Sequence, residues 1–493
     1  MTTMTGTILP RACSMLADEY LTAFRVLVLN GPRQAGKTTI LRQLQARHGG
    51  TLLNLDDELL LQAALADPIA FAASGSEPRF IDEVQRAGDA LIRAIKSEVD
   101  AQPRPGRYVL AGSTRFLATP SLSESLAGRA GVLEVWPFSQ GEFTGQLATF
   151  IDQAFADPAA LRRLSASGYD RAEYFRRICR GGFPEPALMN STRARSAWFR
   201  SYVQAIVERD IREMTRLNEP SAIRTLLAYL ASVTAQELNT STAAGKTGLH
   251  RTTITRYLEL LEAVFLVHRL PTWSRNLTAR VIKHPKVHLT DTGLAAALLG
   301  ISPEALARPV APARGPLVET FIVNELAKQA TWSQEPVRLF HWRVSGAAEV
   351  DLILEQADGH IIAIEAKATD TVTADDFRGL ASLRDLLGEQ FIQGVVLHTG
   401  QGALSFGDRL VSLPIASLWE TGKLTLLRDG GPLRTSIGAL SRSGGVNTRD
   451  DPPSAGPVRL SCLRPASPRV SRAASWRCGT AACTAAFRSA RTR

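Results

Sequence analysis

A glycine-bounded loop near the N-terminus has the residue types and the spacing that bind phosphate. Gly31 and Gly36 bracket the loop, and Lys37 and Thr38 follow at once, which gives the pattern G-x-x-x-x-G-K-T. Glycine lets backbone N–H groups approach phosphate oxygens that a side chain would obstruct. The lysine supplies charge to the β- and γ-phosphates of ATP, and the threonine hydroxyl is a Mg²⁺ ligand. The residues expected around the nucleotide are Gly31, Arg33, Gln34, Ala35, Gly36, Lys37, Thr38 and Thr39.

Acidic and polar residues that would complete this site follow later apolar runs. Asp82 would hold Mg²⁺, and Glu83 would act in catalysis by orienting or deprotonating the attacking water. Ser113, or its neighbour Thr114, is the candidate γ-phosphate contact, with a helix N-cap as the alternative role. Arg129 could reach a phosphate in its own or a neighbouring subunit, or could simply form a surface ion pair.

A second group of reactive residues lies in the last third of the chain. Asp351 and Glu365 fall on two consecutive predicted strands, and Lys367 shares the face of Glu365 because side chains alternate along a strand. Two carboxylates and a lysine could hold a divalent metal, with Asp351 and Glu365 as ligands, and activate water for phosphodiester cleavage. A preceding helix offers Glu325, or less favourably Glu319, as a further acid. Surface ion pairs are the plain alternative.

The elements that must position these groups alternate between strand and helix in the first part of the chain. An apolar run, 26–29, precedes the glycine loop, and an amphipathic segment follows it. We therefore predict an α/β P-loop ATPase domain with a parallel sheet over 20–150. A helical lid or linker is expected over 151–220, with Tyr202 and Ile206 in its core and Arg209, Asp210 and Arg212 on a charged helix face.

The region 221–292 has the pattern of a winged helix-turn-helix. It predicts a short helix, a glycine turn, a second helix over 251–263, and strands over 264–267 and 286–289. The second helix would present Arg251, Thr252, Thr253 and Arg256 to DNA phosphates or base edges. The alternative is a module that packs on the ATPase or binds a protein, since phosphate binding normally needs clustered positive charge.

Taken in order, four segments resemble an AAA-type ATPase domain from a large prokaryotic family whose C-terminal domain is uncharacterised. They are GPRQAGKTT, FIDEVQR, AGSTRF and SLAGRAGVLEVWPFSQGEF. Segments 181–186 and 202–211 are similar to the family's connecting helices, and the resemblance extends from about residue 20 to about residue 425. It implies nucleotide-driven movement of attached domains, often within oligomers. The D…E-x-K arrangement resembles restriction-endonuclease-like folds, which implies a small α/β domain of that kind over 315–427.

Composition favours a cytoplasmic globular protein without membrane contact. The 493 residues are 45% hydrophobic and 21% charged, and no apolar run approaches the ~20 residues of a membrane span. The first ten residues lack a signal-peptide pattern, and the five cysteines show neither metal-type spacing nor an even number.

The basic charge is concentrated at the end of the chain. Residues 430–493 carry eleven arginines and two aspartates, a formal charge of +9, whereas the whole chain carries +10. This Gly/Ser/Pro/Arg-rich stretch has no helical or strand period, and we predict a disordered basic tail. It is either a non-homologous extension or an arm that tethers RNA or DNA.

Three functional hypotheses follow from these residues. The first is an ATP-binding, ATP-hydrolysing AAA-type protein, with ATP and Mg²⁺ as cofactors, that couples nucleotide state to a DNA-related or regulatory C-terminal domain. The second is an ATP-gated, metal-dependent DNA nuclease. The third is a signalling or scaffold ATPase that binds a protein partner or forms homo-oligomers.

Overall fold

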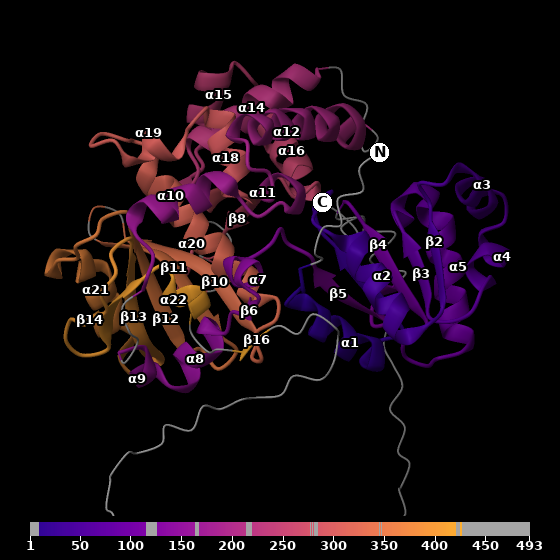
Figure 1. Ribbon diagram of the computed structural model, residues 1–493, viewed down its shortest axis with the longest axis horizontal. Coiled ribbons are helices and arrows are strands. Elements are labelled where there is room, and N and C mark those ends of the chain that lie inside the picture. Colours follow the sequence, from indigo (N-terminus) through magenta and orange to yellow (C-terminus); the bar gives the residue numbers. More distant parts are fainter. Residues whose placement is uncertain are drawn as a thin grey trace, which may run out of the picture. The chain divides into compact units, whose positions relative to one another are not determined.

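The computed structural model describes residues 9–114, 126–162, 167–212, 219–276, 278, 280, 284–344, 346, 348–420 and 424–425 (Figure 1). The predicted tail over 430–493 lies outside the described residues, as does the segment that Thr114 or Ser113 would cap. Across these ranges, no helix combines the length and the apolar character that a membrane crossing requires.

The N-terminal part is a five-stranded parallel sheet with the strand order β2-β3-β4-β1-β5. Its strands are β1 (Val26–Asn30), β2 (Thr51–Asn54), β3 (Arg79–Asp82), β4 (Tyr108–Gly112) and β5 (Ala130–Glu134). Both faces are covered by helices, which explains why most of these strands read as continuous apolar runs. The predicted α/β sheet is confirmed.

Two separate apolar cores lie on the two faces of this sheet. One core contains residues of α1 (Cys13–Ala23) and α2 (Lys37–His48). The other lies beneath α3 (Glu58–Ala66), α4 (Pro68–Ala73), the short η1 (Val84–Ala87) and α5 (Gly88–Ala101). Alternate residues of β1 divide between them, since Val26 and Val28 enter one core and Leu27 and Leu29 the other.

A predominantly helical region follows the sheet. Its helices are α7 (Gln140–Thr144), α8 (Phe150–Ala156), α9 (Pro158–Leu161), α10 (Arg171–Arg180), α11 (Pro184–Ala187), α12 (Thr192–Ala205), the π-helical turn η3 (Ile206–Ile211) and α14 (Pro220–Ser232). Tyr202 and Ile206 lie in the core as predicted. On the predicted charged face Arg209 and Arg212 are exposed, whereas the placement of Asp210 there is wrong, because its side chain is only 3% exposed.

The next elements follow the predicted order of helix, turn, helix and strands. Helix α15 (Thr240–Thr247) ends at Gly248, whose φ is +72°, and α16 (Arg251–Ala263) follows. The sheet has the order β7-β9-β8, formed by β7 (Gln236–Glu237), β8 (Val267–Leu270) and β9 (Lys286–Leu289). Strand β8 starts later than predicted because the chain turns after α16. Helices α18 (Thr292–Leu299) and α19 (Pro303–Ala307) come next.

The C-terminal part is a six-stranded mixed sheet with the order β10-β11-β12-β13-β15-β14. Its strands are β10 (Val337–Val344), β11 (Ala348–Gln356), β12 (Ile361–Lys367), β13 (Phe391–His398), β14 (Leu404–Ser405) and β15 (Leu410–Pro414). The associated helices are α20 (Arg314–Ala330), η4 (Ala374–Phe377), α21 (Arg378–Leu387), η5 (Gly388–Gln390) and α22 (Ser417–Glu420). The two-residue strands β6 (Gln146–Leu147) and β16 (Leu424–Thr425) pair separately.

One continuous core joins the helical region to this C-terminal sheet. It contains residues from α8 through α18 together with α20, one face of β11 and β12, and Trp419 of α22. The opposite face of the sheet packs on α21. The middle and C-terminal regions therefore share their apolar interior, whereas the parallel sheet has its own two cores.

Close backbone contact fixes α10 against α18. Gly181 has a φ of +73°, and a Cβ built on it would lie 2.3 Å from Oδ1 of Asp291. The N–H of Gly182 donates to Asp291 at 2.6 Å, and a Cβ on Gly293 would lie 2.8 Å from the carbonyl oxygen of Arg180. Glycine is required at these positions because side chains would separate the two helices.

Candidate nucleotide site and C-terminal acidic cluster

The glycine loop joins β1 to α2 in a conformation that forms a tight cradle. Gly36 has a φ of +99°, and Gln34 adopts a φ of +61° despite carrying a side chain. A Cβ on Gly31 would lie 2.1 Å from the carbonyl oxygen of Val135, so this position also requires glycine. The helix N-terminus that follows favours anions through its dipole. Ala35 lies within the loop, and Thr39 lies in the first turn of α2.

Lys37 folds back onto the loop that precedes it. Its Nζ donates to the carbonyl oxygens of Gly31 at 2.9 Å and of Pro32 at 2.8 Å, and its side chain is buried. Burial lowers the pKa of Lys37 to about 8, although the carboxylates of Glu83 and Asp82 act in the opposite direction. A cation held only by neutral carbonyl oxygens is well placed to exchange them for phosphate oxygens.

The ends of three adjacent strands bring the other predicted residues together. Thr38 Oγ1 donates to Asp82 Oδ2 at 2.6 Å, and Ser113 Oγ donates to Glu83 Oε2 at 3.1 Å. Gln85, which was not predicted, donates to both Glu83 and Ser113. Burial raises the pKa of Asp82, while its hydrogen bond from Thr38 opposes the shift. The hydroxyl and the carboxylate are hard oxygen ligands side by side, a donor pair that fits Mg²⁺.

Arg129 lies at the opposite end of the parallel strands from the glycine loop. It precedes β5, which runs parallel to β1, so it is found near the strand beginnings while the glycine loop follows the strand ends. Its guanidinium forms two hydrogen bonds with Asp100, at 2.6 and 2.8 Å. The chain does not bring Arg129 to its own nucleotide loop, and action on a neighbouring subunit stays a prediction.

Residues from outside the predicted site contact the glycine loop. Arg33 Nε donates to Asp210 of η3 at 2.6 Å, and the Tyr202 hydroxyl donates to the Arg33 carbonyl oxygen at 3.2 Å. Arg11 donates to the carbonyl oxygen of Ala35 at 2.6 Å. Arg11 precedes the first predicted strand and belongs to no motif, so only the folded structure identifies it. The charged residues over 209–212 could be read from the sequence, but the pairing of Asp210 with Arg33 could not.

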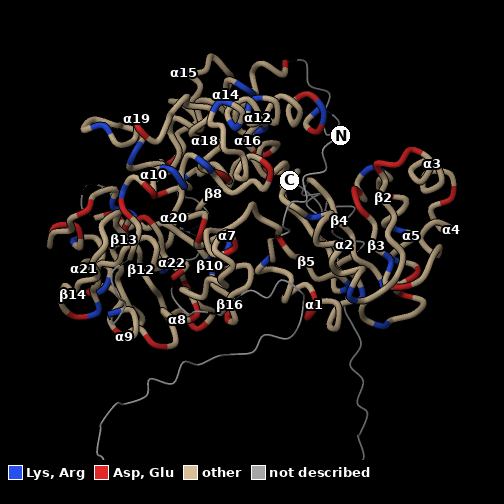
Figure 2. The backbone as a smooth tube through the Cα atoms, in the orientation of Figure 1, with Lys and Arg blue, Asp and Glu red and all other residues tan. Residues whose placement is uncertain are grey.

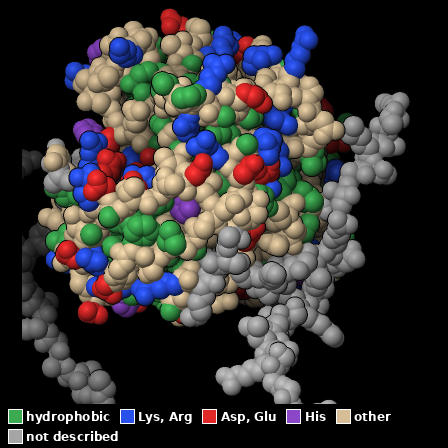
Figure 3. Space-filling model, turned by 60° about the vertical axis from the view of Figure 1, so that its left-hand side comes forward, with side chains coloured by type: hydrophobic (Ala, Val, Ile, Leu, Met, Phe, Trp, Pro, Cys, Tyr) green, Lys and Arg blue, Asp and Glu red, His purple; other side chains and the backbone are tan. Residues whose placement is uncertain are grey.

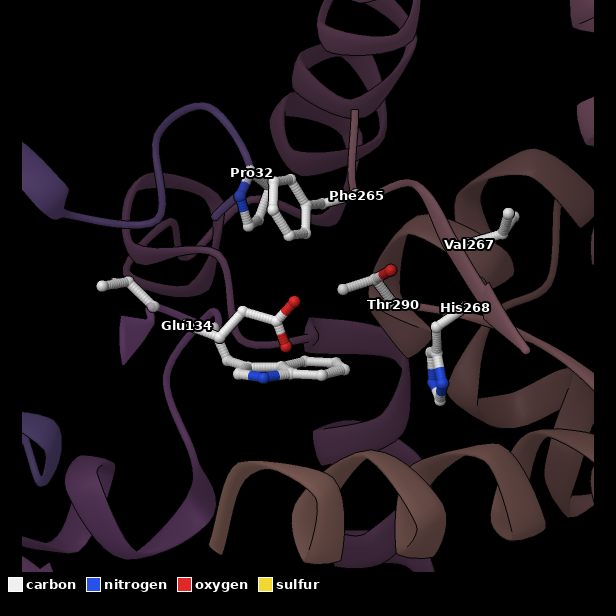
Figure 4. A pocket seen from close by; sticks show the side chains of 8 residues that line it. Pro32, Glu134, Phe265, Val267, His268 and Thr290 are labelled. Atoms are coloured by element: carbon white, nitrogen blue, oxygen red, sulfur yellow. The ribbon is translucent and has the colours of Figure 1, made fainter. Parts of the chain in front are cut away.

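A small cavity lies beside the loop (Figure 4). Its volume is about 10 Å³, enough for about one water molecule. Pro32 and Phe265 lie side by side at one end of it, and Glu134, His268 and Thr290 line it from other elements. The cavity is too small to hold a nucleotide base.

In the C-terminal sheet the three predicted residues converge on β11 and β12. Lys367 Nζ donates to Glu365 Oε1 at 3.0 Å, and the N–H of Ala366 donates to Asp351 Oδ2 at 3.0 Å. Burial, with a further contribution from Asp351, raises the pKa of Glu365 to about 8.

The helix-borne acid of this cluster is Glu319, and the preference for Glu325 is wrong. Glu319 forms an ion pair with Lys286, which in turn contacts Asp351. Glu325 faces the other way, accepting from the N–H of Gln140 at 2.8 Å and from Lys328 at 2.7 Å. The two acids are six positions apart, and the α-helical period of 3.6 places them on different faces.

Lys286 was not predicted as a member of this cluster. The sequence offered a weak signal, because a lysine begins the otherwise largely apolar strand over 286–289. Within the described ranges, no group of three or more His, Cys, Asp or Glu side chains is arranged to hold a metal ion.

The predicted DNA-binding residues occupy the start of α16. Arg251, Thr252 and Arg256 are exposed, Thr253 is half-buried, and Ile254 enters the core. Basic and acidic residues are interspersed along the described chain (Figure 2), and they alternate on the face drawn in Figure 3. Contact between these residues and DNA stays a prediction.

The parallel sheet, its strand order and the loop define a P-loop ATPase domain of the AAA type. Residues 23–144 match the family described as an AAA domain. Residues 171–305 and 314–418 match two domains of unknown function, DUF8612 and DUF4143. The predicted resemblance to prokaryotic AAA-type ATPases with an uncharacterised C-terminal domain is thereby confirmed.

Relatives share most of the chain's length. An uncharacterised protein of Mycobacterium tuberculosis is 29% identical over 405 residues, which cover 81% of this chain and 82% of the relative. An uncharacterised protein of Methanocaldococcus jannaschii is 21% identical over 418 residues, covering 80% and 88%.

Two solved structures were also found to be similar. The Walker-type ATPase of Pyrococcus abyssi covers 58% of this chain and 94% of its own, with 16% identity and a TM-score of 0.36. The RuvB Holliday junction branch migration motor of Thermotoga maritima covers 53% and 90%, with 20% identity and a TM-score of 0.26.

Proposed function

We propose that this protein binds and hydrolyses ATP with Mg²⁺, and that nucleotide state controls the contact between the glycine loop and the helical region. The observation that supports the proposal is the grouping of Lys37, Thr38, Asp82, Glu83 and Ser113 at the ends of three neighbouring strands. These are the residue types that phosphoryl transfer from a nucleotide requires.

Each residue has a defined role in this proposal. Lys37 would exchange its loop carbonyls for the β- and γ-phosphate oxygens. Thr38 and Asp82 would hold a magnesium ion, which would neutralise phosphate charge. Glu83 accepts a hydrogen bond from Ser113, which fixes its carboxylate for orienting the attacking water. Because Ser113 is also the candidate γ-phosphate contact, binding of the γ-phosphate would affect the position of the Glu83 carboxylate.

The contact with the helical region would report the presence of nucleotide. Arg33 belongs to the loop, yet its guanidinium pairs with the buried carboxylate of Asp210. Phosphates bound in the loop would compete with Asp210 for Arg33, because guanidinium groups bind phosphate strongly. Breaking this ion pair would alter η3, whose π-helical turn is a type of irregularity frequent at functional sites.

Two substitutions test ATP binding and hydrolysis separately. Lys37→Ala should abolish ATP binding measured by calorimetry. Glu83→Gln should bind ATP normally and lower the hydrolysis rate by about 100-fold or more, since it removes the group that positions the water. Arg47→Ala, at the far end of α2, is the matched control and should change neither quantity. Unchanged binding in Lys37→Ala would refute the proposal.

Metal-dependent DNA cleavage is the second candidate function, favoured by the convergence of Asp351, Glu365 and Lys367. Duplex, branched and single-stranded DNA should be incubated with Mg²⁺ or Mn²⁺, with and without ATP. Cleavage that disappears in Asp351→Ala and Lys367→Ala would support it. Intact ATPase activity without cleavage would favour a regulatory or scaffold role in which the C-terminal region binds a partner.

DNA contact by α16 needs its own measurement. Retention of a labelled duplex should weaken in Arg251→Ala with Arg256→Ala if the helix contacts phosphates, and this loss should diminish at higher salt. Equal retention by this variant and the unaltered protein would leave the helix as a protein-contact element.

A further inference from the structure

The centre of the C-terminal acidic cluster is occupied by a side chain from another part of the chain. Nζ of Lys286, in β9, lies 2.7 Å from Glu319 Oε1, 2.9 Å from Glu349 Oε1 and 3.0 Å from Asp351 Oδ1. The ammonium group has three hydrogen-bond donors and here faces three carboxylates. Its three N–H donors therefore engage the carboxylates that a divalent cation would need.

Lys286 is fixed in this position by its strand. β9 is the central strand of its sheet, pairing with β7 on one side and β8 on the other, and Lys286 is only 2% exposed. The chain beyond β8 then joins the edge of β10, where the N–H of His341 donates to Pro271 and the N–H of Trp273 donates to His341. Backbone hydrogen bonds thus tie the small sheet to the C-terminal sheet just beyond Leu270, which pairs with Lys286.

The residues of the cluster do not fit a divalent cation while Lys286 is present. Such an ion would lie within a few ångströms of the ammonium group, where two cations repel each other strongly in a poorly hydrated site. A cation at the position of the Lys286 ammonium would also have to break its three ion pairs, leaving a buried charge unpaired. Glu365 forms its own ion pair with Lys367.

We propose that the Lys286 ammonium occupies the position that a divalent metal would take in the predicted nuclease-like site. The cluster then binds no metal, and its ion pairs hold β9 against the C-terminal sheet. The nuclease-like constellation of Asp351, Glu365 and Lys367 is then structural in this protein. The inference does not depend on the proposed ATPase function, and it excludes the metal-dependent DNA cleavage that is the second candidate function.

Binding of Mn²⁺ to the full chain without nucleotide tests the proposal, by calorimetry or electron paramagnetic resonance. Asp351→Asn should bind as much Mn²⁺ as the unaltered protein, because the cluster holds no metal in either. Lys286→Met keeps the length of the side chain and removes the charge. It should bind Mn²⁺ at least tenfold more tightly than the unaltered protein does. Adding Asp351→Asn to Lys286→Met should abolish that tighter binding, and Lys286→Arg should not create it.

Either of two results would overturn the inference. The first is Mn²⁺ binding by the unaltered protein that Asp351→Asn abolishes. The second is a folded Lys286→Met protein without any site that depends on Asp351. If Lys286→Met does not fold, the comparison of the unaltered protein with Asp351→Asn still decides the question. Failure of the ATPase proposal would appear in Lys37→Ala and would leave these measurements unaffected.

Discussion

At the scale of single residues, the surroundings of Lys37 bear directly on the proposed binding of ATP. Its ammonium is buried and bonded to neutral carbonyl oxygens, and these surroundings favour the uncharged amine more than water does. Phosphate reverses that preference, because the charged form gains an anionic partner. In the proposed function, ATP binding and protonation of Lys37 are therefore coupled.

We predict that ATP affinity falls as pH rises above about 8, the pKa of Lys37. Binding requires the protonated form, so about tenfold weaker binding is expected at pH 9 than at pH 7. Calorimetry in buffers of different ionisation enthalpy should show proton uptake at pH 9. In Lys37→Arg, if it still binds ATP, both effects should be absent; the same pH dependence there would assign the titration to another group.

Asp210, like Tyr202, connects the helical region to the loop. In Asp210→Asn the Arg33 guanidinium loses its carboxylate partner and becomes available to phosphate, so ATP should bind about three- to tenfold more tightly. Glu208→Gln, in the same π-helical turn, is the matched control, because Glu208 pairs with Arg224 rather than with the loop. Unchanged or weaker ATP binding in Asp210→Asn would show that Asp210 does not compete with phosphate.

At the scale of elements, the junction of α10 and α18 depends on glycine. Gly181→Ala should lower the free energy of unfolding by about 2–3 kcal/mol, because a Cβ there combines a φ of +73° with a clash against Asp291. Gly245→Ala is the control: Gly245 lies within α15 with no atom near its Cβ position, and alanine should stabilise that helix by about 0.5–1 kcal/mol. Chemical denaturation measures both values, and equal effects would refute the argument.

The elements themselves could largely be read from the sequence. Apolar runs and turn residues predicted the strands of the parallel sheet, α16, and β11 with β12, because local periodicity and capping determine where such elements begin and end. The strands β13 and β15 were not predicted individually, although they complete the C-terminal sheet.

Long-range pairing accounts for what sequence reasoning missed. Lys286 and Asp351 are brought together by two different sheets, and Arg33 meets Asp210 only after the helical region has folded. No local pattern records such contacts. Glu319 was available as a candidate, but its choice over Glu325 depended on which face of α20 meets β9.

At the scale of the whole molecule, the shared core predicts how the chain responds to truncation. A chain that ends at residue 312 lacks α20 and the C-terminal sheet, which supply a large part of the core beneath α12 and α14. We expect such a protein to bind ATP through its intact parallel sheet but to lose the cooperative thermal unfolding of the helical region.

Limited proteolysis provides the readout for this prediction. The truncated protein should be digested to a resistant fragment that contains the parallel sheet, and ATP should protect that fragment further. A protease-resistant helical region in the truncated protein would show that the middle part folds without the C-terminal sheet.

The separation between the cores also has a consequence during translation. Both cores of the parallel sheet are complete once Val135 has left the ribosome, whereas the shared core waits for Trp419. At ordinary rates of synthesis, roughly 5–20 residues per second, that interval lasts about 15–60 s. During that time the nascent chain would have a folded parallel sheet, while the apolar residues of the shared core stayed exposed. We expect ATP to bind the folded sheet first and chaperones to bind the exposed apolar residues afterwards.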